Sequence, residues 1–196
     1  LLRNLPVTNA YSHTLIVREM LHAGIKEAIP YFQQELSRAT NETVKLDLAA
    51  SLRCLGDPSV KTMLLSWLAD DSFKHKVQIV EEMVRLNDAS VVPAIRNCVD
   101  AEDDLLAVEA RSALLRLGDP DGKRLLLDMI QRSTNPIVRY NAIHPLNWNY
   151  SGDFTDKEKE TIADLVHDKD PTISRVAGFI VKKWKPTSGT PSAATQ

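Results

Sequence analysis

The sequence predicts an all-α protein, a right-handed α-solenoid of about five two-helix repeats preceded by an N-terminal half-repeat. The first observation is a tetrapeptide that recurs every 31 residues, as Leu55-Gly56-Asp57-Pro58, Leu86-Asn87-Asp88-Ala89 and Leu117-Gly118-Asp119-Pro120. The second is an apolar pair with a spacing of four in each first helix. The third is an apolar or small triplet with the same spacing in each second helix, which places its members on one helix face.

Each residue type of the tetrapeptide suits the junction between two helices. Leu is the last apolar residue of one helix, and Gly or Asn adopts the left-handed backbone conformation that ends it. Asp then caps the next helix, whose first turn accepts Pro because the missing N–H has no intrahelical partner there. The motif therefore predicts where one repeat ends and the next begins.

The apolar patterns place the helices along the chain. The first-helix pairs are Phe32/Leu36, Leu64/Leu68, Ile95/Val99, Leu126/Ile130 and Ile162/Val166. The second-helix triplets are Val44/Leu48/Leu52, His75/Ile79/Met83, Leu106/Ala110/Leu114, Val138/Ala142/Leu146 and Ile173/Ala177/Val181. Polar links with expected capping residues start the second helices, at Asn41, Asp71, Asp104, Asn135 and Asp170.

These patterns divide the chain into three parts. An irregular lead-in covers residues 1–11, a repeat domain covers 12–185, and a flexible tail covers 186–196. The half-repeat at 12–23 either caps the apolar end of the array or is a repeat cut in two. The full repeats are expected near 24–55, 56–86, 87–117, 118–150 and 151–185.

Composition excludes several classes of protein. The net charge of −2 and charged fraction of 26% give no whole-molecule field that attracts a polyanion. No apolar run reaches the roughly 18 residues of a membrane span. Cys54 and Cys98 occupy different repeat positions, so we expect free thiols in or near the core. We expect the chain to be part of a longer protein, with a cytoplasmic location favoured and any targeting information upstream of Leu1.

Further residues recur at equivalent places and carry a family resemblance. Ile29-Pro30-Tyr31-Phe32 matches Val92-Pro93-Ala94-Ile95, and Val44-Lys45 matches Val138-Arg139. With the tetrapeptide, these residues resemble the HEAT repeat, in the short version named after the phycobilin lyases, over 12–184. The resemblance implies a scaffold, adaptor or regulatory domain, since a minority of the family are enzymes.

Motifs for chemistry are not found. None of the five histidines is followed by Glu, which excludes the repeated His-Glu metal pairs of the related deoxyhypusine hydroxylases. No His, Cys, Asp or Glu grouping has zinc-like spacing, and there is no phosphate loop or nucleophile elbow. We therefore expect no catalytic residues, no metal and no cofactor.

Two sets of surface positions are candidates for binding. The position before the closing residue of each second helix is often a cation. These cations either form a row that faces an acidic partner or are favoured there because they interact with the helix dipole. The polar side of the second helices, which usually lines the concave surface of such folds, changes from acidic to aromatic along the chain. Its carboxylates fit either a solvated helix face or a binding patch. The first set is His22, Cys54, Arg85, Arg116, Trp148 and Lys183, and the second is Asp47, Glu81, Glu82, Glu109, Asn141, His144, Trp148 and Phe179.

The fourth repeat departs from the pattern. Its closing tetrapeptide is missing, and the next first helix is displaced to a spacing of 36 residues instead of 31. Pro145 lies inside the predicted second helix at a cost of about 3 kcal/mol, which predicts a kink or an early stop. The nearby Trp148, Tyr150 and Phe154 form either a binding surface or a plug for the gap, with the surface favoured for Trp148 and the plug for Phe154. Thr155 and Glu158 have the spacing of a capping box.

The function favoured by these observations is a non-enzymatic scaffold or adaptor that binds a protein or peptide through its concave face, within a larger protein or complex. The alternatives are a chromophore-handling enzyme similar to the phycobilin lyases and a HEAT-like nucleic-acid binder. Net charge counts against nucleic acid. The candidate partner-binding residues are Arg85, Arg116, Asn141, His144, Trp148, Tyr150, Glu81 and Glu109.

Overall fold

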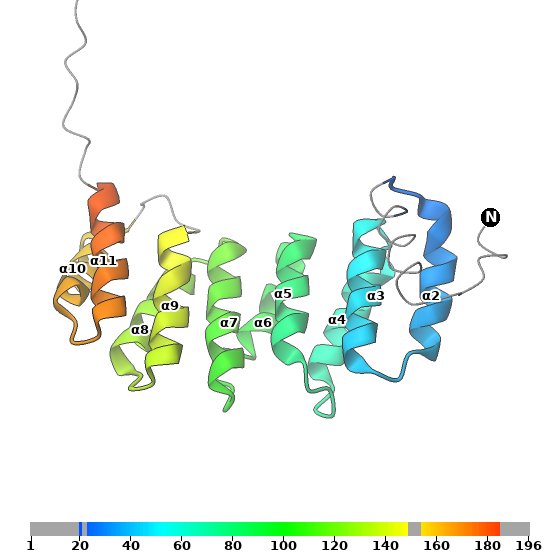
Figure 1. Cartoon of the computed structure of the whole chain (residues 1–196), viewed down its shortest axis with the longest axis horizontal. Coiled ribbons are helices and arrows are strands. Elements are labelled where there is room, and N and C mark those ends of the chain that lie inside the picture. Colours follow the sequence, from blue (N-terminus) through cyan, green and yellow to red (C-terminus); the bar gives the residue numbers. More distant parts are fainter. Residues whose placement is uncertain (1–19, 21–22, 149–153, 185–196) are drawn as a thin grey trace, which may run out of the picture. The chain divides into compact units, whose positions relative to one another are not determined.

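The computed structural model describes residues 20, 23–148 and 154–184 (Figure 1). This part of the chain contains ten α-helices and no β-strand, which confirms the all-α prediction. The first helices of the repeats are α2 (Ile29–Arg38), α4 (Ser59–Ala69), α6 (Val92–Arg96), α8 (Gly122–Arg132) and α10 (Asp156–Asp164). The second helices are α3 (Glu42–Cys54), α5 (Lys76–Leu86), α7 (Asp104–Arg116), α9 (Pro136–Trp148) and α11 (Pro171–Trp184). Three 3₁₀ turns adjoin first helices: η2 (Lys26–Ala28), η3 (Ala89–Val91) and η4 (Leu165–His167).

The chain forms two compact units, Leu1–Ala94 and Ile95–Gln196. In the first unit, α2 packs against α3 and α4 against α5. In the second unit, α9 packs against α7, α8 and α11, so the three second helices α7, α9 and α11 are successive neighbours (Figure 1). The predicted pairing of consecutive helices is confirmed. The right-handed twist and the single repeat domain stay predictions, and the N-terminal half-repeat and the tail lie outside the described residues.

The helix junctions have the predicted backbone geometry. Gly56 and Gly118 have φ of +77° and +76°, and Asn87, at the equivalent position, has φ of +52°. The N–H of Asp57 donates to the Leu52 carbonyl at 3.0 Å and that of Gly56 to the Arg53 carbonyl at 2.9 Å. Equivalent bonds form around Gly118, and together they satisfy carbonyls at the end of each second helix in a Schellman motif.

The aspartate of each junction bonds in two directions. Its Oδ1 accepts an N–H two residues further on: that of Ser59 at 2.9 Å, of Ser90 at 2.9 Å or of Asp121 at 3.0 Å. The same carboxylate also accepts from the first helix of the preceding repeat. The donors are Gln33 to Asp57 at 2.8 Å, Lys61 to Asp88 at 2.9 Å and Arg96 to Asp119 at 2.7 Å. Each aspartate thus starts one helix and ties it to an earlier one.

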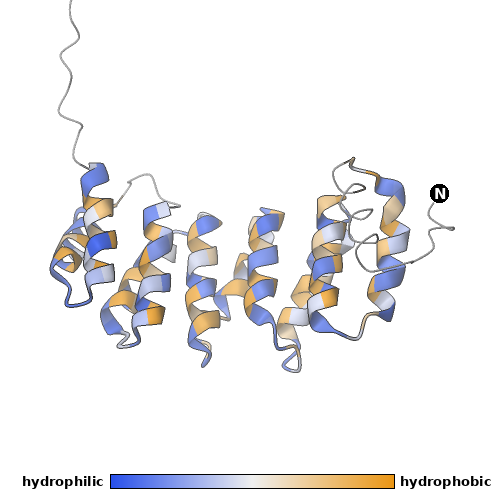
Figure 2. Ribbon diagram, in the orientation of Figure 1, coloured by the Kyte–Doolittle hydropathy of each residue, from blue (hydrophilic) through white to orange (hydrophobic). Residues whose placement is uncertain are grey.

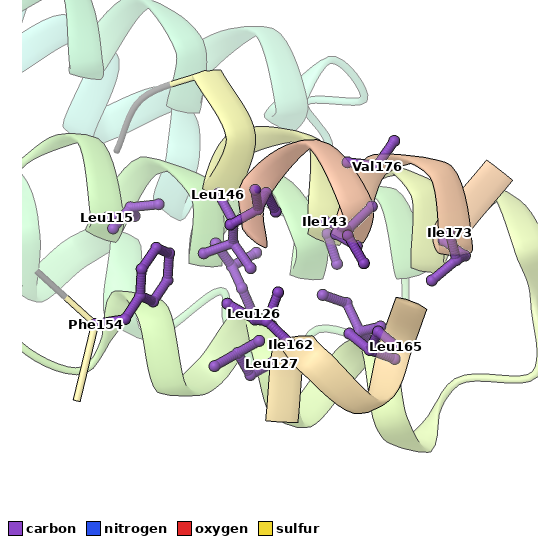
Figure 3. Close-up of a cluster of buried hydrophobic side chains, with 14 of the residues drawn as sticks. Leu115, Leu126, Leu127, Ile143, Leu146, Phe154, Ile162, Leu165, Ile173 and Val176 are labelled. Carbon is purple, nitrogen blue, oxygen red and sulfur yellow. The ribbon is translucent and has the colours of Figure 1, made fainter. Parts of the chain in front are cut away.

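Burial confirms most of the predicted core. All members of the α7 and α9 triplets are buried. Two of them, Ala142 and Leu146, belong to a core cluster of the second unit that also contains side chains of α7, α8, α10 and α11. Figure 3 shows Leu115 and Phe154 near one end of this cluster and Ile173 near the other. Val44 is wrong as a core residue, because it is 46% exposed while Leu46, Ala49 and Leu52 form the buried stripe of α3.

Four further predictions are corrected. The cap of α7 is Asp103, one residue before Asp104, and the N-cap of α5 is His75 rather than Asp71, which is exposed beside Lys76. Val99 lies outside α6, since that helix ends at Arg96 and the chain continues in turns. Cys54 is exposed, because it ends α3 at the outward edge position instead of facing the core. By contrast, the side chains of Asn41, Asn135 and Asp170 each accept a backbone N–H at the start of a second helix, and the Thr155/Glu158 capping box is present.

A close backbone contact yields a stability prediction. A Cβ added at Gly122 would lie 2.5 Å from the Leu115 backbone nitrogen, where α8 crosses the end of α7. Gly122→Ala should therefore lower the free energy of unfolding by about 1–3 kcal/mol through overpacking. The matched control is Gly178→Ala, since a Cβ there meets nothing within 4 Å and the change should stabilise α11 by about 0.5–1 kcal/mol. Urea unfolding of both variants checks the prediction, and equal effects of the two changes would contradict it.

The Asp88 junction yields a pH prediction. Hydrogen bonds from the Lys61 ammonium, and then from Ser90, lower the pKa of Asp88 from 3.8 to about 2. A lowered folded-state pKa stabilises the fold above the unfolded pKa, and the effect is lost as pH falls toward the folded value. The stability difference between the native chain and Asp88→Asn should be full at pH 7 and shrink between pH 4 and pH 2. In the Lys61→Met background, the same urea titrations should show a weaker pH dependence of this stability difference. A stability difference between the native chain and Asp88→Asn that stays constant down to pH 2 would refute the prediction.

Candidate functional site

Three aromatic side chains follow one another along the surface of α9. Tyr140, His144 and Trp148 are spaced by four residues, which places them in line on one helix face. The ring centroids of Tyr140 and His144 are 5.4 Å apart, and those of His144 and Trp148 are 5.7 Å apart. Tyr140 is 39% exposed and Trp148 is 71% exposed. We call these three residues the aromatic stripe.

Helix α9 continues through Pro145 for three more residues. Of the two predicted outcomes, the early stop is therefore wrong and the kink stays a prediction. The pyrrolidine ring of Pro145 is buried together with Ile143 and Leu146. Burial of these apolar groups offsets the roughly 3 kcal/mol that an internal proline costs. Since Pro145 has no N–H, it leaves the carbonyl oxygen of Asn141 without its usual helical donor, next to the aromatic stripe.

Trp148 and Phe154, which flank the gap in the described residues, have opposite environments. Phe154 is 5% exposed, with its ring centroid 5.4 Å from that of Trp184 and the Lys123 ammonium 5.6 Å from its own ring centroid. The plug interpretation is confirmed for Phe154. The exposure of Trp148 contradicts a plug there and agrees with the surface interpretation. Tyr150 lies outside the described residues.

Helix α11 adds another exposed aromatic side chain and several cations beside α9. Phe179, at the position equivalent to His144, is 49% exposed, and the Lys182 ammonium lies 5.9 Å from its ring centroid. Lys183, equivalent to Trp148, donates through Nζ to the Asn147 carbonyl near the end of α9. Figure 2 shows hydrophobic and hydrophilic residues next to each other on α9 and α11.

The cationic edge positions are engaged by carboxylates of their own units. In the first unit, Glu82 accepts from Arg85 and, at 2.9 Å, from Arg53 of α3. Glu82 is 7% exposed, so its assignment to a solvated helix face is wrong; it bridges α3 and α5 instead. In the second unit, Arg116 Nη1 lies 3.7 Å from Glu109 Oε1. These pairs fit the dipole interpretation of the edge cations better than an open row that faces an acidic partner.

The predicted site residues are distributed over both units. Arg85 and the half-buried Glu81 lie in the first unit, on α5. The second unit brings together the half-buried Asn141 and His144, the exposed Trp148, and the Arg116/Glu109 pair. Sequence analysis missed Tyr140, Ile137, Leu105 and Arg175, all exposed on second helices of this unit. The spacing of Tyr140 from His144 and Trp148 was a signal that could have identified it.

A depression of about 430 Å³ lies elsewhere in the second unit, beside the start of α7 and along α8. Its charged groups largely pair with one another, since Arg111 contacts Asp100 at 3.3 Å and Arg124 contacts Asp128 at 3.4 Å. Burial lowers the pKa of Arg111. Opposite charges that neutralise each other leave this depression with no evident chemistry for a ligand.

The described residues contain neither a metal-binding group nor a membrane-spanning helix. No cluster of three or more His, Cys, Asp or Glu side chains in this part of the chain could hold a metal ion. None of the helices described is long and apolar enough to cross a membrane.

Comparison with known proteins identifies the repeats. No curated protein matches the chain. The family model described as HEAT repeats matches residues 62–147, which run from within α4 to near the end of α9. This match includes two of the recurring junctions and all of the aromatic stripe except Trp148, which follows directly. Residues 62–147 therefore match HEAT repeats.

Proposed function

We propose that the chain is a non-enzymatic scaffold or adaptor module that binds a protein or peptide on the exposed side of α7, α9 and α11, within a larger protein or complex. HEAT repeats generally mediate protein interactions and are typically non-catalytic. The observation that carries the proposal is the 71% exposure of Trp148 at the end of an aligned aromatic stripe. An exposed tryptophan next to other aromatics is the composition that binding hot spots favour.

The stripe is held in place by its own helix. Tyr140 and His144 contact each other, and His144 contacts Trp148, while the opposite side of α9 is fixed in the core by Val138, Ala142 and Leu146. A partner that buries these rings therefore orders few additional side chains, which reduces the entropic cost of binding. Pre-organisation of this kind supports a binding role for Trp148.

Polar groups around the stripe provide orientation. The side chain of the half-buried Asn141, one residue after Tyr140, is a polar group beside the stripe that could bond to a partner. The Arg116/Glu109 pair lies on the neighbouring helix α7. An apolar centre with a polar border matches the composition of protein interfaces.

Removal of Trp148 tests the proposal. Trp148→Ala should weaken partner binding by about 2 kcal/mol or more, because a central aromatic anchor is lost. Since the ring is largely exposed, the melting temperature should stay nearly unchanged. Cross-linking first identifies the proteins that the native chain and the variant capture. Each captured protein is then titrated against the native chain and against Trp148→Ala to compare the two affinities.

The control is Val44→Ala, which removes an exposed apolar side chain of the first unit. Partners captured by the native chain should be retained by this control and lost by Trp148→Ala. Binding that survives Trp148→Ala unchanged, or a melting temperature that falls steeply in that variant, would remove the basis of the proposal.

A further inference from the structure

The geometry points to an acidic peptide segment with an aromatic or large aliphatic anchor as the occupant of the surface formed by α9 and α11. This inference rests on the proposed function and specifies its partner. The observation behind it is a surface on which the exposed rings of α9 and α11 lie beside cations of α11, with no carboxylate from either helix.

Charge on these two helices has one sign. Neither Pro136–Trp148 nor Pro171–Trp184 contains an Asp or Glu, whereas both contain cations. Arg139 is neutralised, because it pairs with Asp168 in the link before α11. Arg175 and Lys182 form no ion pair within the part of the chain that the structure describes, so their charge is available to a partner.

The nearby acids do not cancel this charge. Asp168 and Asp170 lie at the start of α11, where Asp168 pairs with Arg139 and Asp170 caps the helix. On the other side of α9, Glu109 of α7 lies beside Arg116. The C-terminal half of α11 therefore presents Lys182 and Lys183 at the surface, beside the uncharged end of α9. Lys183 also counters the negative end of the α9 dipole through its bond to the Asn147 carbonyl.

The cations lie close to the apolar anchors. Lys182 is 5.9 Å from the Phe179 ring centroid, and Lys183 contacts the residue directly before Trp148. A peptide whose aromatic or aliphatic side chain packs against Trp148 or Phe179 would place adjacent carboxylates near these ammonium groups. A basic segment would meet repulsion at the same positions, which gives the surface its specificity.

A single-stranded nucleic acid is a less suitable occupant. Neutralisation of a phosphate backbone needs more clustered cations than Arg175, Lys182 and Lys183 provide. We therefore assign the surface to a peptide.

Selection from a random displayed 12-residue peptide library on the immobilised full chain tests the inference. The enriched peptides should be net acidic and carry at least one aromatic or large aliphatic residue. Their affinity should fall about tenfold or more with Trp148→Ala, and by a similar factor with the double variant Arg175→Glu/Lys182→Glu. Lys157→Glu, an exposed charge reversal on α10, is the matched control and should change affinity less than about twofold.

The outcomes separate the inference from the function it rests on. Enriched peptides that depend on Trp148 but are neutral or basic overturn the acidic partner and leave the binding function standing. A failure to enrich any Trp148-dependent peptide overturns both. Tighter binding of a fluorescent oligo-dT 15-mer than of the selected peptides, lost in Trp148→Ala, assigns the surface to nucleic acid and also overturns the inference. Thermal melts of all variants confirm that each remains folded.

Discussion

The junction aspartate is the interaction on which the repeats depend. Asp57, Asp88 and Asp119 each follow a residue with positive φ, accept a backbone N–H at the start of the next helix, and accept a side-chain donor from the preceding first helix. A carboxylate held by charge-assisted bonds fixes direction more strongly than a neutral cap does. The same carboxylate therefore bonds the backbone at the start of one first helix and the side chain of the first helix before it.

Helix α9, the second helix of the fourth repeat, lacks the closing junction found in the earlier repeats. No Leu-Gly-Asp segment comes after Trp148 in the sequence. Phe154 lies in the core of its unit (Figure 3), and its ring contacts that of Trp184. Phe154 supplies the apolar group that seals this end of the core. Trp148 is then not required for packing and stays largely exposed. The exposed aromatic stripe thus accompanies the altered boundary between the fourth and fifth repeats. The same helix tolerates its internal proline because the ring of Pro145 is buried.

The sequence was most informative where a short-range rule governs the structure. The positive φ of Asn87, the caps at Asn135 and Asp170 and the buried triplet of α7 all follow from spacing and local bonding. Some errors were local, such as the cap of α7, which lies one residue earlier than predicted, and another arose where a partner lies about one repeat away along the chain. Glu82 resembles a solvated surface acid until Arg53 of α3 is placed beside it. For the candidate site, the sequence predicted that Trp148 is exposed and that Phe154 turns inward, but it missed Tyr140 as a member of the aromatic stripe.

The separation of the two helix sides explains how a binding surface can change while the repeat persists. In α7 the outward position before the closing leucine is Arg116 with Glu109 beside it, and in α9 the equivalent positions are Trp148 and Asn141. The buried residues Ala110 and Ala142 remain identical between the two helices. Substitutions on the outward side therefore cost little packing energy, whereas those on the inward side open cavities. Trp148 and Asn141 in place of Arg116 and Glu109 turn a self-neutralised charged edge into an uncharged aromatic one, while the buried side of the helix keeps its packing.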